Sequence, residues 1–393
     1  SRNSPRPKPR SEAGPPAPAP GGRRGPRPMK IVCAASVLFA REAFAGLGEV
    51  EILPDRDIRR EHLRNAQALI VRSKTVVGPA LLEGTPVEFV ATATAGADHF
   101  EIPWLNHAGL AWSASPGCNA NAVAEYVATA LVLLARQRAA LLPGKTLGIV
   151  GVGQVGARVA QKAALLGLHV LRNDPPLALQ TGSAEYLPLE TVLPAADILT
   201  LHVPLETAGP FPTRHLADCR LFEKLKPGAW FLNAARGAVA DSDALQCALD
   251  HHLLSACVLD VWENEPALPA ALRQAVDFLT PHIAGYSFEG LLNGTLQCRR
   301  ELAHFLELES DWAPDPARLP PVPFIQIDAA HRPDEEVLAE LLAAACPLPE
   351  DTRAWRAEMT ADDPAELRRR FDRFRQNYTS RREFAAIRVH LSH

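Results

Sequence analysis

Residues 146–156 read TLGIVGVGQVG, an apolar run followed by glycines at three fixed positions, Gly151, Gly153 and Gly156. In a strand–turn–helix unit the first glycine permits a tight turn, and the second lets a phosphate approach the backbone. The third allows the helix to pack closely on the strand. This spacing alone is weak evidence, because it recurs by chance in glycine-rich loops. Here it lies between an apolar strand and a helical pattern that ends at Gly167, and this context predicts a dinucleotide-binding turn.

The residues after the turn indicate which dinucleotide is bound. A second strand, expected at Leu168–Arg172, leads to Asp174. A carboxylate at this place can accept hydrogen bonds from the adenosine ribose hydroxyls and would repel a 2′-phosphate. Pro175 and Pro176 come next, where an arginine could accommodate that phosphate. We therefore expect NAD as the cofactor rather than NADP.

Short apolar runs alternate with amphipathic stretches on both sides of the glycine-rich turn, which is typical of α/β folds with parallel sheets. Strands are expected at Lys30–Cys33, Ala68–Val71, Glu88–Thr92, Ala111–Ser113, Thr146–Val150, Leu168–Arg172, Ile198–Leu201, Trp230–Asn233 and Ser255–Leu259. Helices are expected at Asn119–Arg138, Val155–Leu166, Ser242–Asp250 and Gly290–Leu308. Asn119 or Asn121 is placed to cap the first of these helices.

The two ends of the chain depart from this pattern. Residues 1–28 hold nine prolines and seven basic residues with almost no bulky apolar side chains, which predicts a disordered tail. An over-extended gene start or a solvated tail is the favoured interpretation, and a nucleic-acid-binding arm is the alternative. At the other end, a Pro-rich stretch leads into a small α+β unit. Its strands are expected at Phe324–Ile327 and Ala386–Val389, and its helices at Glu335–Ala345 and Pro364–Tyr378.

Composition and charge narrow the class of protein. The 393 residues suffice for two or three domains, and a hydrophobic content of 47% suits packed globular domains. The net charge of −4 gives no general reason to expect nucleic acid or a membrane surface as a partner. Seven scattered cysteines without C-x-x-C spacing argue against a disulfide framework or a zinc site, so no metal is expected. No apolar run approaches the ~20 residues that span a bilayer, and we expect a soluble, cytoplasmic protein.

Three residues carry side chains suited to one reaction. Arg236, Glu265 and His282 all fall after predicted strands, where open α/β sheets bind their ligands. Removal of hydride from a secondary alcohol needs a base for the hydroxyl proton, and histidine suits this role. A neighbouring carboxylate would fix the histidine tautomer, while a guanidinium can bind a substrate carboxylate and polarise the oxygen at C2. Together they predict oxidation of a 2-hydroxy acid, although each residue considered alone is weak evidence.

The order of these motifs resembles the D-2-hydroxyacid dehydrogenases. The shared series is G-x-G-x-x-G, Asp174, LHVP at 201–204, N-x-x-RG at 233–237, DVWE-x-EP at 260–266 and PHIAG at 281–285. Within this family, the chain most resembles the branch of the erythronate-4-phosphate dehydrogenases. The segments that carry this resemblance are MKI at 29–31, ATATAGADH at 91–99, SPGCN at 115–119, AEYV at 124–127 and HIAGY at 282–286. The segments FDRFRQNY at 371–378 and RREF at 381–384 resemble the C-terminal dimerisation domain of that branch.

The resemblance implies an α/β fold of three domains. A doubly wound, parallel-sheet Rossmann domain is inserted in a second, flavodoxin-like α/β domain that binds the substrate, and a small C-terminal α+β domain forms a homodimer. The expected boundaries are 1–28 for the tail, 29–118 and 283–312 for the substrate-binding domain, 119–282 for the NAD-binding domain and 313–393 for the dimerisation domain.

The resemblance also implies residue roles. His282 acts as the base with support from Glu265, and Arg236 binds the substrate. The implied NAD-binding residues are Gly151, Gly153, Gln154, Val155, Gly156, Asp174, Val203, Ala234, Asp260 and Gly285. The implied substrate-binding residues are Ser73, Thr94 and Tyr286.

The implied function is NAD-dependent oxidation of a small phosphorylated 2-hydroxy acid, 4-phospho-D-erythronate, to 2-oxo-3-hydroxy-4-phosphobutanoate in vitamin B6 biosynthesis. One alternative is a related dehydrogenase that acts on glycerate, phosphoglycerate or a similar acid. Another is a regulatory protein that senses NAD and works by binding partners. Retention of Arg236, Glu265 and His282 argues against the sensor, since a sensor needs only the nucleotide-binding side.

Overall fold

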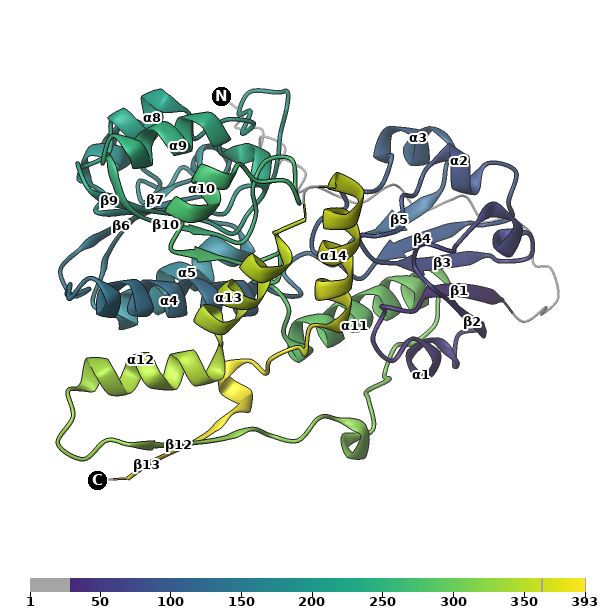
Figure 1. The fold of residues 1–393 in the computed structure, drawn as a ribbon. Helices are drawn as coiled ribbons and strands as arrows, with labels where there is room; N and C mark the ends of the chain where they lie inside the picture. The colour runs from purple at the N-terminus through teal and green to yellow at the C-terminus, as the bar shows by residue number, and fades with distance from the viewer. Residues whose placement is uncertain (1–28, 362, 393) are drawn as a thin grey trace, which may run out of the picture. The chain divides into compact units, whose positions relative to one another are not determined.

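The structure is a computed structural model that describes residues 29–361 and 363–392 (Figure 1). Within this range the chain divides into two compact units. Unit 1 comprises residues 29–118 and 291–319, and unit 2 comprises residues 119–290 and 320–392. The tail expected to be disordered, residues 1–28, lies outside the described residues. Among the helices that the structure describes, none is long and apolar enough to cross a membrane.

Unit 1 is built on a five-stranded, fully parallel sheet with the order β2-β1-β3-β4-β5. This is the flavodoxin-like order, as expected. The strands are β1 (Lys30–Ala34), β2 (Glu49–Leu53), β3 (Ala68–Val71), β4 (Phe89–Thr92) and β5 (Ala111–Ser113). The helices are α1 (Ala40–Phe44), α2 (Pro79–Leu82), α3 (Ile102–His107) and the larger part of α11 (Phe288–Phe305). Every residue of β3 and β4 is buried, as a parallel sheet covered on both faces requires.

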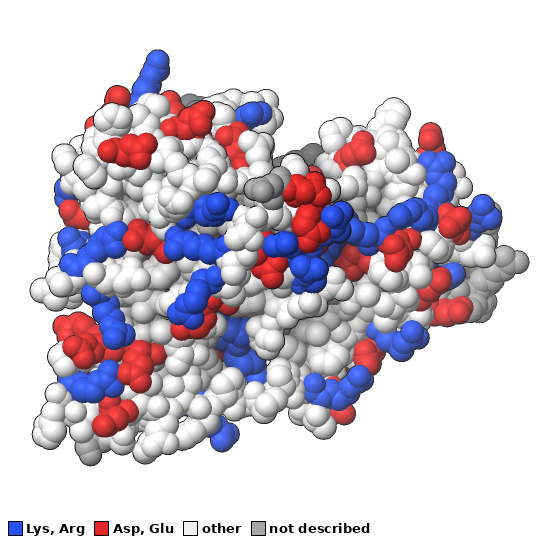
Figure 2. Space-filling view, in the orientation of Figure 1, with Lys and Arg blue, Asp and Glu red and all other residues white. Residues whose placement is uncertain are grey.

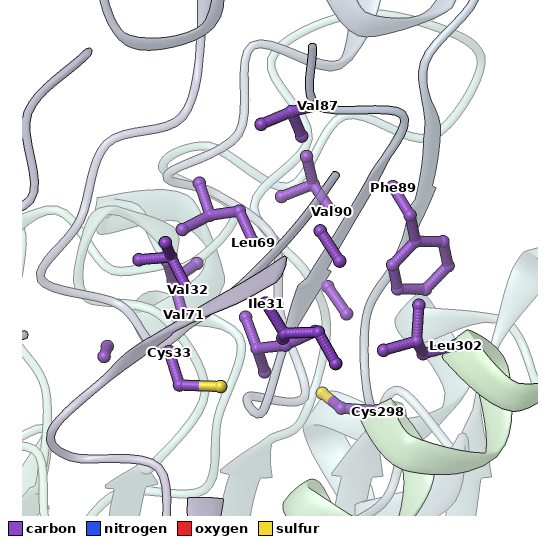
Figure 3. Close-up of a cluster of buried hydrophobic side chains, with 14 of the residues drawn as sticks. Ile31, Val32, Cys33, Leu69, Val71, Val87, Phe89, Val90, Cys298 and Leu302 are labelled. Carbon is purple, nitrogen blue, oxygen red and sulfur yellow. The ribbon is translucent and has the colours of Figure 1, made fainter. Parts of the chain in front are cut away.

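The core of unit 1 joins segments that are far apart in the sequence. Figure 3 shows Cys298 and Leu302 of α11 beside Ile31 of β1 and Phe89 of β4. The ring of Phe89 also lies 5.3 Å from that of Phe305. The residues of α11 are therefore needed to cover the sheet of unit 1.

Unit 2 contains a six-stranded parallel sheet with the order β11-β10-β9-β8-β6-β7. The strands are β6 (Thr146–Val150), β7 (His169–Asn173), β8 (Ile198–Leu201), β9 (Ala229–Asn233), β10 (Leu254–Leu259) and β11 (Phe278–Leu279). Because β7 and β8 flank β6 on its two sides, the strand order reverses at β6. Ligands of doubly wound sheets bind at such a switch point, and the glycine-rich turn directly follows β6.

Helices cover both faces of this sheet (Figure 1). One face packs against α4 (Ala120–Gln137) and α5 (Gln154–Leu165), and α12 (Asp334–Ala345) packs on α4. The other packs against α8 (Cys219–Glu223), α9 (Ser242–Asp250), α10 (Ala270–Ala275), α13 (Leu348–Glu358) and α14 (Pro364–Asn377). The short helices α6 (Pro175–Thr181) and α7 (Leu189–Val192) follow β7.

The prediction for the cap of α4 is confirmed in its position but not in its hydrogen bonding. Asn119 occupies the N-cap position, but its side chain makes no capping hydrogen bond. It packs instead against Gly285 and Gly290, where a Cβ atom would come within 2.1 Å and 3.0 Å of Asn119. Asn121 bonds to two carboxylates, those of Glu125 and Glu383. Both asparagines therefore serve tertiary contacts within unit 2.

The C-terminal residues belong to the core of unit 2. Strands β12 (Phe324–Asp328) and β13 (Arg388–Ser392) form a separate two-stranded parallel sheet. Trp355 of α13 is fully buried, and its ring stacks on Trp262 at 6.4 Å and meets Phe371 of α14 at 5.5 Å. These rings complete the hydrophobic cluster on one face of the six-stranded sheet.

Candidate active site

The three glycines of the turn after β6 have the surroundings that their positions predict. Gly151 has a φ of +86°, and a Cβ there would come within 2.7 Å of the His202 backbone. A Cβ on Gly156 would lie 2.0 Å from the carbonyl oxygen of Gly151, so the turn and α5 pack without room for a side chain. Gly153 is exposed, and a Cβ there would have no heavy atom within 4 Å. The open side of the turn, at the N-terminus of the 12-residue helix α5, fits a pyrophosphate.

Asp174 lies beside this turn at the end of β7. One carboxylate oxygen accepts a hydrogen bond from the Val152 backbone N–H at 2.8 Å, and the other accepts from Leu177 N–H at 3.0 Å. The side chain thus caps α6 and ties it to the glycine-rich turn. Arg172, the nearest arginine along the chain, forms an ion pair with Glu185 at 3.8 Å. This arrangement favours a ribose with a free 2′-hydroxyl.

Two further expected residues form a direct contact. His282 Nδ1 lies 3.1 Å from Glu265 Oε2, while Glu265 Oε1 accepts from the Trp262 N–H at 3.2 Å. Burial opposes ionisation of Glu265, but the charge and hydrogen bond of His282, with the charge of Arg375, lower its pKa overall. The His282 side chain is 39% exposed, so the imidazole can be reached from solvent while its Nδ1 faces the carboxylate.

His282 has a φ of +58°, an uncommon conformation for a residue with a side chain. The buried carboxylate of Asp260 stabilises the turn that carries it. Asp260 accepts hydrogen bonds from Thr280 Oγ1 at 2.7 Å, Ile283 N–H at 2.8 Å and Ala284 N–H at 3.0 Å. Its backbone oxygen accepts from the His282 N–H at 2.8 Å. Burial raises the pKa of Asp260. Its predicted contact with the nicotinamide stays a prediction.

Arg236 lies in the loop after β9, and that loop contacts the loop after β10. Asn233 Nδ2 donates to the Arg236 carbonyl at 3.0 Å, which fixes the turn. A Cβ on Gly237 would come within 2.0 Å of the Trp262 carbonyl oxygen, so only glycine allows this close approach. Arg236 and Glu265 are therefore presented at the same carboxyl edge of the sheet, as predicted from the strand order.

The other expected cofactor residues lie in or near the same edge of unit 2. Gln154 is exposed and Val155 is half-buried in the first turn of α5. Val203 lies beside Gly151, and the half-buried Ala234 directly follows β9. Gly285 packs on Asn119.

The expected substrate residues are divided between the units. Tyr286 follows the His282 turn in unit 2. Ser73 and Thr94 follow β3 and β4 at the carboxyl edge of the unit 1 sheet. Ser73 is exposed, and the Thr94 hydroxyl bonds to Thr92 Oγ1 at 2.7 Å.

The sequence did not reveal how the C-terminal segment contributes to this site. Arg381 is buried, and its guanidinium donates to the carbonyl oxygens of Ala284 at 2.8 Å and Tyr286 at 3.3 Å. Arg368 of α14 donates to the Glu265 carbonyl. Arg381 begins the RREF segment that marked the C-terminal domain, but no sequence pattern indicated these contacts, since the partners lie about 95–105 positions earlier in the chain.

Comparisons with known proteins agree with this geometry. The family described as D-isomer specific 2-hydroxyacid dehydrogenase, NAD binding domain, matches residues 127–284, and a domain of unknown function matches residues 318–393. Among solved structures, the TT0316 protein from Thermus thermophilus is 26% identical with a TM-score of 0.60, covering 72% of this chain and 99% of that one. The D-lactate dehydrogenase from Aquifex aeolicus, complexed with NAD and lactic acid, is 24% identical with a TM-score of 0.59. That likeness covers 70% of this chain and 95% of that one, and it shows the fold alone.

Full-length relatives are more similar in sequence. The erythronate-4-phosphate dehydrogenase of Salmonella schwarzengrund (strain CVM19633) is 43% identical over 362 residues, which is 92% of this chain and 94% of the relative. The protein of the same name from Salmonella typhi matches with the same identity and coverage. With a likeness of this extent, the chain belongs to the family of erythronate-4-phosphate dehydrogenases, within the NAD-binding D-isomer specific 2-hydroxyacid dehydrogenases.

Proposed function

We propose that the protein oxidises 4-phospho-D-erythronate to 2-oxo-3-hydroxy-4-phosphobutanoate with NAD as cofactor, a step of vitamin B6 biosynthesis. The observation that carries the proposal is the His282–Glu265 pair, at 3.1 Å, at the carboxyl edge of a sheet whose glycine-rich turn fits a dinucleotide. The 43% identity to erythronate-4-phosphate dehydrogenases supports the choice of substrate.

The pair of His282 and Glu265 removes the proton from the substrate hydroxyl. Because Nδ1 of His282 faces Glu265, its Nε2 is left to accept the proton of the C2 hydroxyl. Glu265 then stabilises the imidazolium that forms, in the way a carboxylate orients a catalytic histidine in other enzymes. The lowered pKa of Glu265 keeps this carboxylate ionised at neutral pH.

Arg236 binds and polarises the substrate in the proposed mechanism. Its guanidinium holds the C1 carboxylate with two N–H groups and polarises the oxygen at C2, on which charge changes during the reaction. Gly153, Gln154 and Asp174 would hold the dinucleotide at the turn after β6. When bound, NAD accepts the hydride that leaves C2.

We further propose that the protein is a cytoplasmic homodimer. It needs no nucleic acid or membrane as a partner. The dimer is supported by the small sheet of β12 and β13, because a two-stranded sheet is marginal by itself. Apolar side chains on this sheet are exposed, with Phe324 at 64% and Val389 at 45%. A second copy of the chain would cover them.

A panel of 2-hydroxy acids tests the substrate and separates the alternatives. We expect the highest kcat/KM with NAD and 4-phospho-D-erythronate, compared with D-erythronate, D-glycerate and 3-phospho-D-glycerate. A higher kcat/KM for either glycerate would indicate a related dehydrogenase. Absence of turnover with every acid, together with NAD binding, would support a sensor.

His282→Ala tests whether His282 is the general base. Loss of the imidazole should lower kcat by ~10²- to 10⁴-fold, the usual contribution of a general base. The affinity for NAD, measured by fluorescence titration, should stay nearly unchanged. The control is His251→Ala, which changes an exposed histidine after α9. Retention of more than about a third of wild-type kcat would exclude His282 as the base.

Asp174→Ala tests cofactor choice. NAD binding should weaken and discrimination against NADP should relax, because both the ribose contact and the charge repulsion are lost. Asp174→Asn is the matched control for structure, since its amide oxygen can still accept from one backbone N–H of the two that Asp174 binds. Kd values for both dinucleotides provide the measurement. A wild-type enzyme that prefers NADP contradicts this interpretation of Asp174.

Point variants on the β12–β13 sheet test the dimer better than truncation, because removing the C-terminal residues would expose the Trp262–Trp355 core. Phe324→Asp and Val389→Asp should place charges in the interface and yield monomers. Light scattering over a range of protein concentrations measures the mass. The control is Leu165→Asp, which changes an exposed leucine on α5. Dimers of unchanged affinity in both sheet variants would show that this surface is not the interface.

A further inference from the structure

The arginines of α14 differ in how their charge is neutralised. Three of them pair with carboxylates of α14 or of neighbouring α13. These are Arg369, Arg370 and Arg373. Figure 2 shows such basic and acidic side chains lying next to one another along this helix. Arg368 and Arg375 form no salt bridge within 4 Å to any of the residues that the structure describes; Arg368 donates instead to the Glu265 carbonyl oxygen.

Aromatic rings hold the guanidinium of Arg375 in place. Its central carbon lies 5.4 Å from the ring centre of Tyr286 and 5.2 Å from that of Phe371. Its Nε is buried and has no acceptor among residues 29–361 and 363–392. The Nε atoms of Arg299, Arg356 and Arg381 are also buried without an acceptor among the described residues, so this feature supports a role for Arg375 only together with its position.

Arg375 lies close to the catalytic pair. Its ring partner Tyr286 follows the turn that carries His282, and Arg381 fixes the Tyr286 backbone by donating to its carbonyl at 3.3 Å. The charge of Arg375 also acts on the carboxylate of Glu265, which contacts His282 at 3.1 Å. A positive group is therefore placed against Tyr286 and near enough to Glu265 to act on its charge, and it comes from a different segment than Arg236.

The proposed substrate carries two anionic groups, and the mechanism uses Arg236 for only one of them, the C1 carboxylate. The other is the phosphate on C4, two carbons beyond the carbon that is oxidised. A planar guanidinium suits a phosphate because it donates two parallel N–H bonds and stays stacked on an aromatic ring while doing so.

We propose that Arg375, held against the Tyr286 ring, is a substrate-binding residue that holds the phosphate of the phosphorylated 2-hydroxy acid. This inference rests on the proposed function, since it assumes a substrate with a terminal phosphate. It makes α14 part of the active site in addition to the core, and it gives the C-terminal segment a role in choosing the substrate.

Arg375→Met tests the inference because it keeps an unbranched apolar stem and removes the guanidinium. We expect KM for 4-phospho-D-erythronate to rise ~10- to 100-fold, the range for lost charge-assisted hydrogen bonds, with kcat within about threefold. For D-erythronate, which lacks the phosphate, kcat/KM should fall at least ~10-fold less than for the phosphorylated acid, because only the effect of the Arg375 charge on Glu265 is lost. Arg375→Lys, which keeps the charge without the planar fork, should recover part of the affinity.

Arg373→Met is the matched control on the same helix. Arg373 is exposed and pairs with Glu358 at 3.7 Å, so its loss should leave both substrates unaffected. Calorimetric titration of inorganic phosphate into the NAD complex gives a readout that needs no turnover. The Kd for inorganic phosphate should rise at least about tenfold in Arg375→Met and stay unchanged in Arg373→Met.

The outcomes separate the inference from the proposed function. If Arg375→Met lowers kcat/KM equally for both acids, or leaves the phosphate Kd unchanged, Arg375 has a structural role and the inference is wrong. If Arg375→Met unfolds, Arg375→Gln answers the same question, because it also removes the charge, and an unchanged phosphate Kd would again overturn the inference. If the wild-type enzyme shows no preference for the phosphorylated acid, the proposed substrate is wrong, whatever the variants do.

Discussion

The buried carboxylate of Asp260 is the interaction on which the rest of the site depends. It accepts three hydrogen bonds from residues 280, 283 and 284, and the hydroxyl of Thr280 in turn bonds to Tyr126 of α4 at 2.7 Å. A buried carboxylate left without such partners would cost several kcal/mol, so the turn cannot relax without losing this stabilisation. That constraint holds His282 at its positive φ, with its imidazole directed at Glu265.

The C-terminal segment acts as the outer support of that turn. Trp355 fills the space against Trp262, directly before the loop that carries Glu265. Arg381 satisfies two carbonyl oxygens of the 284–286 segment, which would otherwise be buried without donors. The turn that carries His282, in the part of the chain matched by the NAD-binding domain, is thus supported by a segment that lies outside that match.

Local sequence patterns predicted the parts of the structure that local physics determines. The glycines of the turn, the buried strands and α4 were predicted because their residue types suit only a few conformations. The elements that were not predicted include β2, whose EVEIL sequence alternates charged and apolar residues at a sheet edge, β11, which has only two residues, and α13, which begins with Leu-Pro. The candidate catalytic residues Arg236, Glu265 and His282 could be predicted because each lies in a recognisable sequence motif. The roles of Asp260, Arg375 and Arg381 could not, since they arise from contacts between distant segments.

The covering of the unit 1 sheet by α11 has a consequence for the order of events during synthesis. Residues 29–118 leave the ribosome before the side chains that close their core, among them Cys298 and Leu302, which follow 180 or more residues later. Until then the sheet would expose the apolar face that α11 covers. Contacts of such long sequence separation form slowly, and unpaired apolar surface favours association with other chains. We therefore expect the nascent N-terminal segment to be the part of this protein that depends most on chaperones.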